Sequence, residues 1–133
     1  MPLAMVVDDD ELTARAMRDG LVRAGIGAEV CFGAPDALAR LERGGVDLVL
    51  LDVHLPGASG IDVCAEITRR WPALDVLVMS AYASSDRAQA AVRAGAHDFL
   101  TKPISAESLA QRVVRLTSSR AARERGAGAG ARP

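Results

Sequence analysis

The sequence predicts a single α/β domain, in which helices cover both faces of a five-stranded parallel sheet. Short aliphatic segments alternate five times with longer segments whose apolar residues recur at helical spacing. The third aliphatic segment, residues 46–51, is apolar except for Asp47, which is typical of a strand buried on both faces. The 133 residues are 50% hydrophobic but only 3% aromatic. The core must therefore consist mainly of aliphatic side chains, which suits aliphatic strands packed against alanine-rich helices.

Turn-forming residues punctuate the predicted strands. Gly33 closes the second strand, a turn-rich segment from His54 to Gly60 follows the third, and Pro103 closes the fifth. The five strands are expected at residues 3–7, 28–32, 46–51, 75–80 and 98–101.

The helices between these strands have start and stop signals of their own. Pro35 suits the first turn of the second helix, and Trp71-Pro72 ends the third. Ser84 offers an N-cap to the fourth helix, and Gly95 closes it. Right-handed crossovers of this length give a doubly wound sheet. The helices are expected at about residues 14–24, 35–43, 61–71, 84–94 and 105–116.

The end of the chain differs from the rest in charge. The net charge is −1, yet six arginines and a single glutamate follow Gln111. A basic helix of this kind is usually a solvated face, so we expect no direct nucleic-acid contact by this domain. The Gly/Ala-rich residues 126–133 cannot build a core. We therefore expect a domain over residues 1–120 and a flexible tail, or the start of a linker to an output domain, over residues 121–133.

The cysteines and the amino terminus indicate a compartment. Cys31 and Cys64 form no CxxC motif and have no histidine at metal-binding spacing, so we expect free, buried thiols in a reducing environment. The amino terminus has no basic segment followed by a long apolar stretch. We therefore expect a cytoplasmic protein that does not contact a membrane.

Polar residues collect where the predicted strands end. The carboxyl ends of parallel strands share one edge of the sheet, where ligands usually bind. Three carboxylates converging there would repel one another unless a cation joined them, and hard oxygen ligands without His or Cys favour Mg²⁺, with Mn²⁺ as an alternative, over zinc. The residues expected at this edge are Asp8, Asp9, Asp52, Ser80 and Lys102.

This set of residues suits Mg²⁺-dependent phosphoryl transfer. Mg²⁺ takes only one or two carboxylates and favours an anionic partner. Lys102 offers a point charge and Ser80 a hydroxyl to phosphate oxygens, while Asp52 on the central strand is the candidate nucleophile. Each residue alone has a simpler explanation; Asp52, for example, is a common type of loop cap. Their combination at successive strand ends favours the phosphoryl-transfer site.

Four segments resemble the receiver domain of two-component response regulators, and the similarity covers about residues 3–118. It implies a flavodoxin-like (βα)5 fold with strand order 2-1-3-4-5. It also implies a phosphoacceptor signalling domain and not an enzyme that acts on a separate substrate. The segments are Val6-Val7-Asp8-Asp9-Asp10, DLVLLDVHLPG at 47–57, Met79-Ser80-Ala81 and AGAHDFLTKP at 94–103.

The resemblance implies a role for each residue of the predicted site. Asp52 would accept a phosphoryl group from a phosphohistidine on a sensor histidine kinase or a phosphotransfer protein. Asp9 and Asp52 would hold Mg²⁺, with Asp8 acting mainly through water and the backbone carbonyl of His54 as a further ligand. Lys102 would bridge Asp52 and the phosphoryl group, and the peptide bond that follows Lys102 would be cis.

The resemblance also implies a switch at Ser80 and Phe99. A dianionic group on Asp52 would recruit the Ser80 hydroxyl, and Phe99 would turn inward into the vacated space. The surface of the fourth helix, fifth strand and fifth helix would change, and this face is a candidate for homodimer formation. His54 and Tyr82 occupy positions that tune phosphoryl lifetime in this family, and their bulk predicts a lifetime of minutes or longer. The simpler explanation for Phe99 is a core residue.

Two other function classes are compatible with parts of the pattern. A phosphohydrolase of the haloacid dehalogenase type also uses a strand-end Asp with Mg²⁺ and Lys. That class expects a second Asp two residues after the nucleophile, where this chain has His54, and it usually carries a cap domain. A non-catalytic interaction module would use the same fold without phosphate, and the intact Asp9, Asp52 and Lys102 argue against it.

Overall fold

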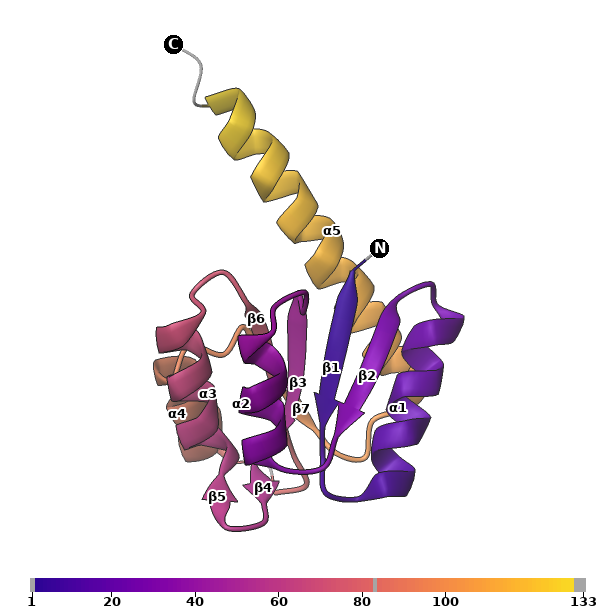
Figure 1. The fold of residues 1–133 in the computed structure, drawn as a ribbon, viewed down its shortest axis with the longest axis vertical. Coiled ribbons are helices and arrows are strands. Elements are labelled where there is room, and N and C mark those ends of the chain that lie inside the picture. Colours follow the sequence, from indigo (N-terminus) through magenta and orange to yellow (C-terminus); the bar gives the residue numbers. More distant parts are fainter. Residues whose placement is uncertain (1, 83, 131–133) are drawn as a thin grey trace.

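The computed structural model describes residues 2–82 and 84–130, and side chains up to residue 119. Strands and helices alternate along these residues, with a two-stranded hairpin inserted after the third strand (Figure 1). The elements are β1 Leu3–Val7, α1 Glu11–Arg23, β2 Gly27–Cys31, α2 Ala34–Glu42, β3 Leu48–Asp52, β4 His54–Leu55, β5 Ala58–Ser59, α3 Gly60–Arg70, β6 Asp75–Ser80, α4 Ser85–Arg93, β7 Asp98–Thr101 and α5 Ala106–Gly130.

Five of the strands form one parallel sheet in the order β2-β1-β3-β6-β7. Counted along this sheet alone, that is the predicted order 2-1-3-4-5, and the predicted fold class is confirmed. All five residues of β3 are buried, and β3 pairs with β1 on one side and β6 on the other. The apolar character of this segment therefore follows from its central place, since neither face of the strand meets water.

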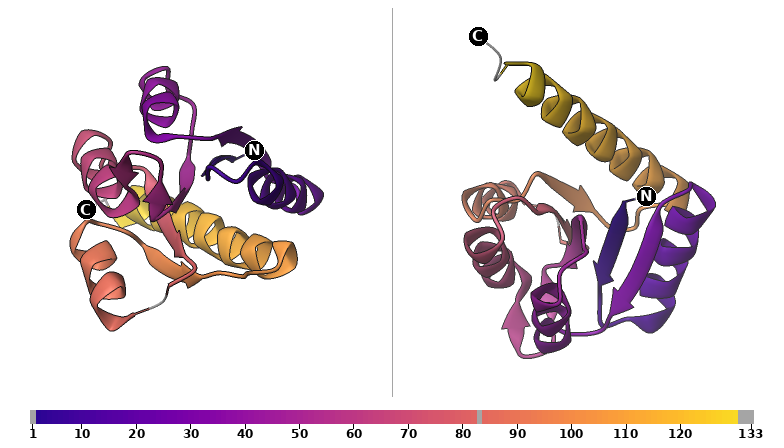
Figure 2. Two further views of the ribbon diagram at one scale, coloured as in Figure 1. Left: turned by 90° about the horizontal axis from the view of Figure 1, so that it is seen from below. Right: turned by 45° about the horizontal axis from the view of Figure 1, so that its top comes forward.

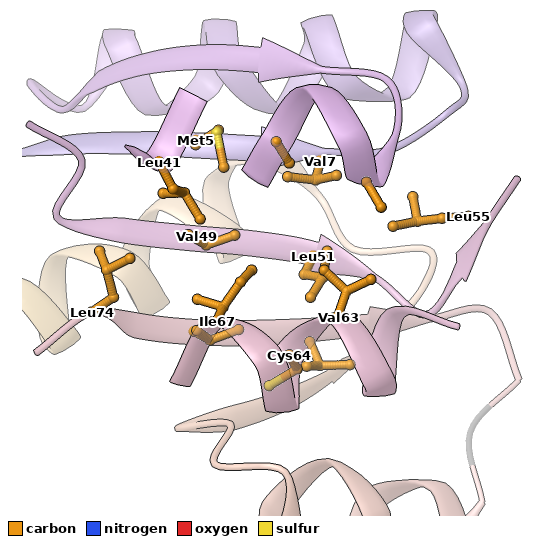
Figure 3. Packing of buried hydrophobic residues seen from close by; sticks show 14 of the residues in the cluster. Met5, Val7, Leu41, Val49, Leu51, Leu55, Val63, Cys64, Ile67 and Leu74 are labelled. Atoms are coloured by element: carbon orange, nitrogen blue, oxygen red, sulfur yellow. The ribbon is translucent and has the colours of Figure 1, made fainter. Parts of the chain in front are cut away.

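Side chains of the strands alternate between two core layers, one on each face of the sheet. In the first layer, α2, α3 and α4 cover the sheet, and Figure 3 shows Leu41 and Ile67 close to Val49. In the second layer, α1 and α5 cover the opposite face, with Leu21 and Leu109 fully buried. Each such aliphatic side chain contributes about 1.5–3 kcal/mol when it is removed from water, so the two layers hold the strand ends in fixed positions.

The structure differs from the sequence prediction at both ends of β3. The strand starts at Leu48 and not at residue 46. The neighbouring Asp47 instead bonds the start of β1: its N–H donates to the carbonyl of Leu3 at 2.8 Å, and its carboxylate accepts from the Leu3 N–H at 2.9 Å. After β3, the turn-rich segment contains an antiparallel pair of strands, β4 and β5. The sequence did not predict this pair, because strands of two residues are too short to show an alternation of apolar and polar residues.

The first turn of α5 packs closely against α1. A Cβ atom built on Gly20 would lie 2.5 Å from the Cβ of Ala106, so only glycine permits this approach of the two helices. Further along α5, Arg112 forms an ion pair with Asp98 of β7. The base of α5 is therefore fixed both to its neighbouring helix and to the edge strand of the sheet.

α5 is longer than the sequence predicted, because it continues to Gly130. Residues 121–130, expected as a flexible tail or the start of a linker, have a helical backbone, and residues 131–133 lie outside the described residues. The expectation of a tail or linker itself stays a prediction. Alanine has the highest helix propensity, and extending an existing helix needs no new nucleation, which offsets the cost of the interspersed glycines. Figures 1 and 2 show these last turns projecting away from the sheet. The domain boundary at residue 120 stays a prediction.

Two further expectations concern the thiols and the membrane. Cys31 and Cys64 are both free, but only Cys64 is fully buried, and Cys31 is half-buried. Burial raises the pKa of the Cys64 thiol to about 11, so this thiol is protonated at neutral pH. Among the helices in the described part of the chain, none combines the length and the apolar character needed to cross a membrane.

Gly60→Ala should destabilise the domain, because Gly60 is the point where α3 approaches the end of β3. A Cβ atom at this position would lie 2.1 Å from the carbonyl oxygen of Asp52 and 2.6 Å from the Cα of Val53. These are backbone atoms, so the chain must shift, and we expect a loss of about 2 kcal/mol or more in the free energy of unfolding. Urea denaturation measures this loss.

Gly33→Ala is the matched control for this substitution. Its Cβ would meet only the ring of Pro35 at an ordinary 3.8 Å, so we expect a loss of about 1 kcal/mol or less, from the weaker helix cap alone. Equal losses in the two variants would contradict the close approach at Gly60.

Candidate functional site

The structure places the five residues that were predicted to share one edge at the carboxyl ends of four neighbouring strands. Asp8 and Asp9 follow β1, and Asp52 is the last residue of β3. Ser80 ends β6, and Lys102 follows β7. The parallel register of the sheet makes these ends coincide, so residues up to 94 positions apart in the sequence come into contact.

Three carboxylates form the acidic part of the site. Each of Asp8, Asp9 and Asp52 offers one oxygen, and these oxygens lie within 4.8 Å of one another. Asp8 and Asp52 are only 1% and 5% exposed, whereas Asp9 faces solvent. Buried carboxylates this close repel one another. The donors are hard oxygens alone, so the group fits a hard cation such as Mg²⁺ better than zinc.

The ammonium group of Lys102 joins the two buried carboxylates. Its Nζ lies 2.5 Å from Asp8 Oδ2 and 3.0 Å from Asp52 Oδ2. Burial alone would lower the pKa of Lys102, but the hydrogen bonds and charges of Asp8 and Asp52 outweigh burial and hold this pKa above its usual value. Lys102 is therefore charged at neutral pH. The contact with Asp8 was not predicted from the sequence.

Asp52 uses its two oxygens differently. Oδ1 accepts the backbone N–H of His54 at 3.0 Å, and Oδ2 accepts from Lys102. Asp52 therefore does cap the following loop, as the sequence allowed, but it uses only Oδ1 for this contact. Burial raises the pKa of Asp52 above its usual value, and the negative charge of Asp8 adds to this, although the bonds from His54 and Lys102 act in the opposite direction.

Ser80 is fully buried, and its hydroxyl is bonded within its own loop. Oγ accepts the N–H of Tyr82 at 3.0 Å and donates to the carbonyl of Tyr82 at 3.3 Å. Phe99 lies in β7, partly buried against the core layer of α2, α3 and α4. The peptide bond between Lys102 and Pro103 is cis, as the resemblance implied.

Two aromatic rings meet beside the site. The rings of His54 and Tyr82 are in edge-to-face contact, with centroids 5.2 Å apart and planes at 88°. Both residues are exposed. The structure adds a residue that sequence reasoning missed, since Arg87 of α4 donates from Nη1 to the carbonyl of Tyr82 at 2.7 Å. No sequence signal marks this contact, because it depends on the path of the loop before α4.

Comparison with known proteins identifies the family. The response regulator receiver domain family matches residues 4–114. The chain belongs to this family. The sensory transduction protein RegX3 of Mycolicibacterium smegmatis is 38% identical over 113 residues, which are 85% of this chain and 49% of RegX3. The response regulator protein FleR of Pseudomonas aeruginosa is 39% identical over 111 residues, which are 84% of this chain and 24% of FleR.

The fold has close counterparts among solved receiver domains. The CheY-like receiver domain protein of Methanospirillum hungatei superposes with a TM-score of 0.88 at 22% identity, covering 92% of this chain and 98% of that chain. The chain spans about half of RegX3 and about a quarter of FleR. It is thus a receiver domain, a signalling module of two-component systems. Receiver domains bind Mg²⁺ at an acidic pocket and interact with histidine kinases. In this receiver domain, the carboxylates of Asp8, Asp9 and Asp52 lie close enough to one another to hold a metal ion.

Asp52→Asn should raise the melting temperature of the metal-free receiver domain at pH 7. The pKa of Asp52 is raised in the folded state, so the folded protein binds this proton more tightly than the unfolded protein does. Stability then falls as the pH rises from the unfolded value, near 3.8, through the folded value. A neutral amide removes that cost.

Thermal unfolding in EDTA at pH 7 and at pH 4 tests this expectation. The gain of Asp52→Asn over the wild type should be larger at pH 7 than at pH 4, because ionisation of the wild-type carboxyl increases with pH. Asp62→Asn changes an exposed carboxylate and should produce no such gain. A melting temperature at pH 7 below that of the wild type would contradict the expectation.

Proposed function

We propose that this receiver domain accepts a phosphoryl group on Asp52 in a Mg²⁺-dependent reaction. The observation that carries the proposal is the arrangement at the end of β3, where Asp52 lies 3.0 Å from Lys102 and beside the carboxylates of Asp8 and Asp9. The donor is a phosphohistidine of a sensor histidine kinase or a phosphotransfer protein. A carboxylate oxygen of Asp52 forms the new P–O bond, the P–N bond breaks, and the imidazole leaves with its electron pair.

The residues around Asp52 suit the charge that develops in this transfer. Phosphoryl transfer spreads negative charge over the equatorial oxygens of the moving group. Lys102 already lies at Asp52 and balances this charge, and the Ser80 hydroxyl reaches a phosphoryl oxygen if it rotates away from its loop. Mg²⁺, when bound, supplies further positive charge at these oxygens. The transfer needs no separate substrate site, because Asp52 itself accepts the phosphoryl group. The domain would therefore be a phosphoacceptor. It would also lose the phosphoryl group slowly by its own autodephosphorylation.

We propose the metal ligands that the family resemblance implies, and the group of three carboxylates supports this proposal. Asp9 and Asp52 would bind Mg²⁺ directly, and Asp8, which is already bonded to Lys102, would act mainly through water. The backbone carbonyl of His54 would complete the set, since the N–H of His54 bonds Asp52 and keeps this turn next to the carboxylate. Mn²⁺ is an alternative ion with the same preference for oxygen.

The proposed switch begins at Ser80. In this structure the Ser80 hydroxyl donates to the carbonyl of Tyr82, and a phosphoryl group on Asp52 offers it a stronger, charged acceptor. Its movement would leave space for Phe99 to turn inward from its partly buried position. The surface of α4, β7 and α5 would then change and act on an output domain, on a protein partner, or on a second copy in a homodimer.

Three further proposals concern the cellular compartment, contacts with nucleic acid or a membrane, and the lifetime of the phosphoryl group. We place the receiver domain in the cytoplasm, where the free thiols of Cys31 and Cys64 would stay reduced. We propose no direct contact with nucleic acid or a membrane. The rings of His54 and Tyr82 beside Asp52 support a phosphoryl lifetime of minutes or longer, because they would restrict the approach of water.

Acetyl phosphate with Mg²⁺ should add the mass of one phosphoryl group to the wild-type protein. Intact-mass spectrometry measures this gain, which should disappear in EDTA and in Asp52→Asn. Asp62→Asn, which removes an exposed carboxylate, should be phosphorylated like the wild type. No gain in a protein that demonstrably binds Mg²⁺ would instead favour a non-catalytic interaction module.

Asp9→Asn should weaken Mg²⁺ binding by about ten-fold or more, because it removes the charge of a direct ligand. Mg²⁺ binds the folded state and therefore raises the melting temperature, so a titration followed by thermal unfolding gives the dissociation constant. Asp10→Asn is the matched control, since Asp10 is an adjacent, exposed carboxylate outside the acidic group. Equal weakening in the two variants would overturn the ligand assignment.

A further inference from the structure

We propose that Arg87 is a positioning residue, which holds the ring of Tyr82 against His54 and thereby lengthens the lifetime of the phosphoryl group on Asp52. Neither the sequence pattern nor the family resemblance singled out this arginine. The inference rests on the proposed phosphoacceptor role of Asp52, and its test below distinguishes the failure of one from the failure of the other.

Arg87 contacts Tyr82 at two points. Its Nη1 donates to the main-chain carbonyl of Tyr82 at 2.7 Å, and its guanidinium carbon lies 5.6 Å from the centroid of the Tyr82 ring, within the range of a cation–π contact. Arg87 is itself fixed, because its backbone N–H donates to the Oγ of Ser84, the N-cap of α4, at 3.1 Å. Main chain and ring of Tyr82 are therefore both tied to the start of α4.

Tyr82 needs such a restraint because burial does not supply one. The residue is 65% exposed, and an exposed aromatic side chain populates several rotamers unless specific contacts select one. Apart from Arg87, the ring contact that the structure shows for Tyr82 is the edge-to-face pair with His54 at 5.2 Å. Removing the guanidinium would leave, among the described residues, the contact with His54 to orient the ring.

The position of this ring pair bears on the chemistry at Asp52. His54 is on the same turn as Asp52, since its N–H bonds Asp52 Oδ1. Loss of the phosphoryl group requires a water to attack phosphorus opposite the P–O bond to Asp52. That bond breaks, inorganic phosphate leaves, and the carboxylate is restored. Two rings in contact beside the carboxylate restrict this approach more than two rings that move independently.

Arg87 should contribute most to holding the Tyr82 loop after phosphorylation, because Ser80 and Arg87 share the same acceptor in the unphosphorylated protein. The carbonyl of Tyr82 accepts from both Ser80 Oγ and Arg87 Nη1 in this structure. Once the Ser80 hydroxyl turns to the phosphoryl group, that donor is lost to the Tyr82 carbonyl. Arg87 then remains as the side chain that holds the loop, and so the ring of Tyr82 stays in place in the state whose lifetime it controls.

The experiment follows the decay of phosphorylated protein by intact mass after the phosphodonor is removed. Arg87→Ala should decay about three-fold faster than the wild type, the change expected when one exposed cation–π contact and its hydrogen bond are lost. Arg87→Lys should restore most of the lifetime. Tyr82→Ala should decay at least as fast as Arg87→Ala. The double variant should decay no faster than Tyr82→Ala, because Arg87 acts through this ring.

Arg93→Ala is the matched control, since it removes the same charge from the same helix, and the structure shows no ion pair or ring contact for Arg93 within its described residues. It should decay like the wild type. Wild-type decay in Arg87→Ala, or a further acceleration by Arg87→Ala in the Tyr82→Ala background, would overturn the proposal. The second result would mean that the arginine acts independently of the Tyr82 ring.

A nuclear Overhauser contact between the rings of His54 and Tyr82 in the unphosphorylated protein gives an independent readout. We expect this contact in the wild type and in Arg93→Ala, and its loss in Arg87→Ala. Its persistence in Arg87→Ala would overturn the positioning role even if the wild type accepted no phosphoryl group. Failure of phosphorylation in the wild type would count only against the role of Asp52.

Discussion

The ammonium group of Lys102 between Asp8 and Asp52 is the interaction on which the rest of the site depends. It brings together the ends of β1, β3 and β7, and it offsets the repulsion of two carboxylates that are almost fully buried. Without it, these charges would be costly at any pH at which both are ionised. In the proposed phosphoryl transfer, Lys102 would be the partner of the Asp52 carboxylate before transfer and of the phosphate oxygens after it.

Much of the fold was readable from the sequence because it follows from burial. The central strand is apolar on both faces, and the helices repeat their apolar residues at regular spacing, so the order and the type of these elements were predicted. The site residues were found because parallel strands end at one edge, which turns positions such as Asp8 and Lys102 into neighbours. The chemistry of the set followed from the residue types, whereas the detailed role of each residue came from the resemblance; both remain proposals.

What the sequence did not predict depends on the exact path of the chain. The hairpin after β3 contains strands of two residues, too short for any periodicity. The bond of Arg87 to Tyr82 requires the loop before α4 to turn the carbonyl toward the helix. The length of α5 was underestimated because the Gly/Ala-rich end was judged by its inability to build a core, whereas a helix that has already formed can continue without one.

The attachment of α5 gives this helix the mechanics of a lever. It is held at Ala106, where Gly20 allows α1 to touch it, and again at the Asp98–Arg112 pair, with Leu109 buried between these two points. The helix continues for 18 residues after Arg112, which extend about 27 Å at about 1.5 Å per residue. A tilt of only about 5° at Arg112 therefore moves the far end by about 2 Å. The free arm amplifies displacements that would be too small to matter within the sheet.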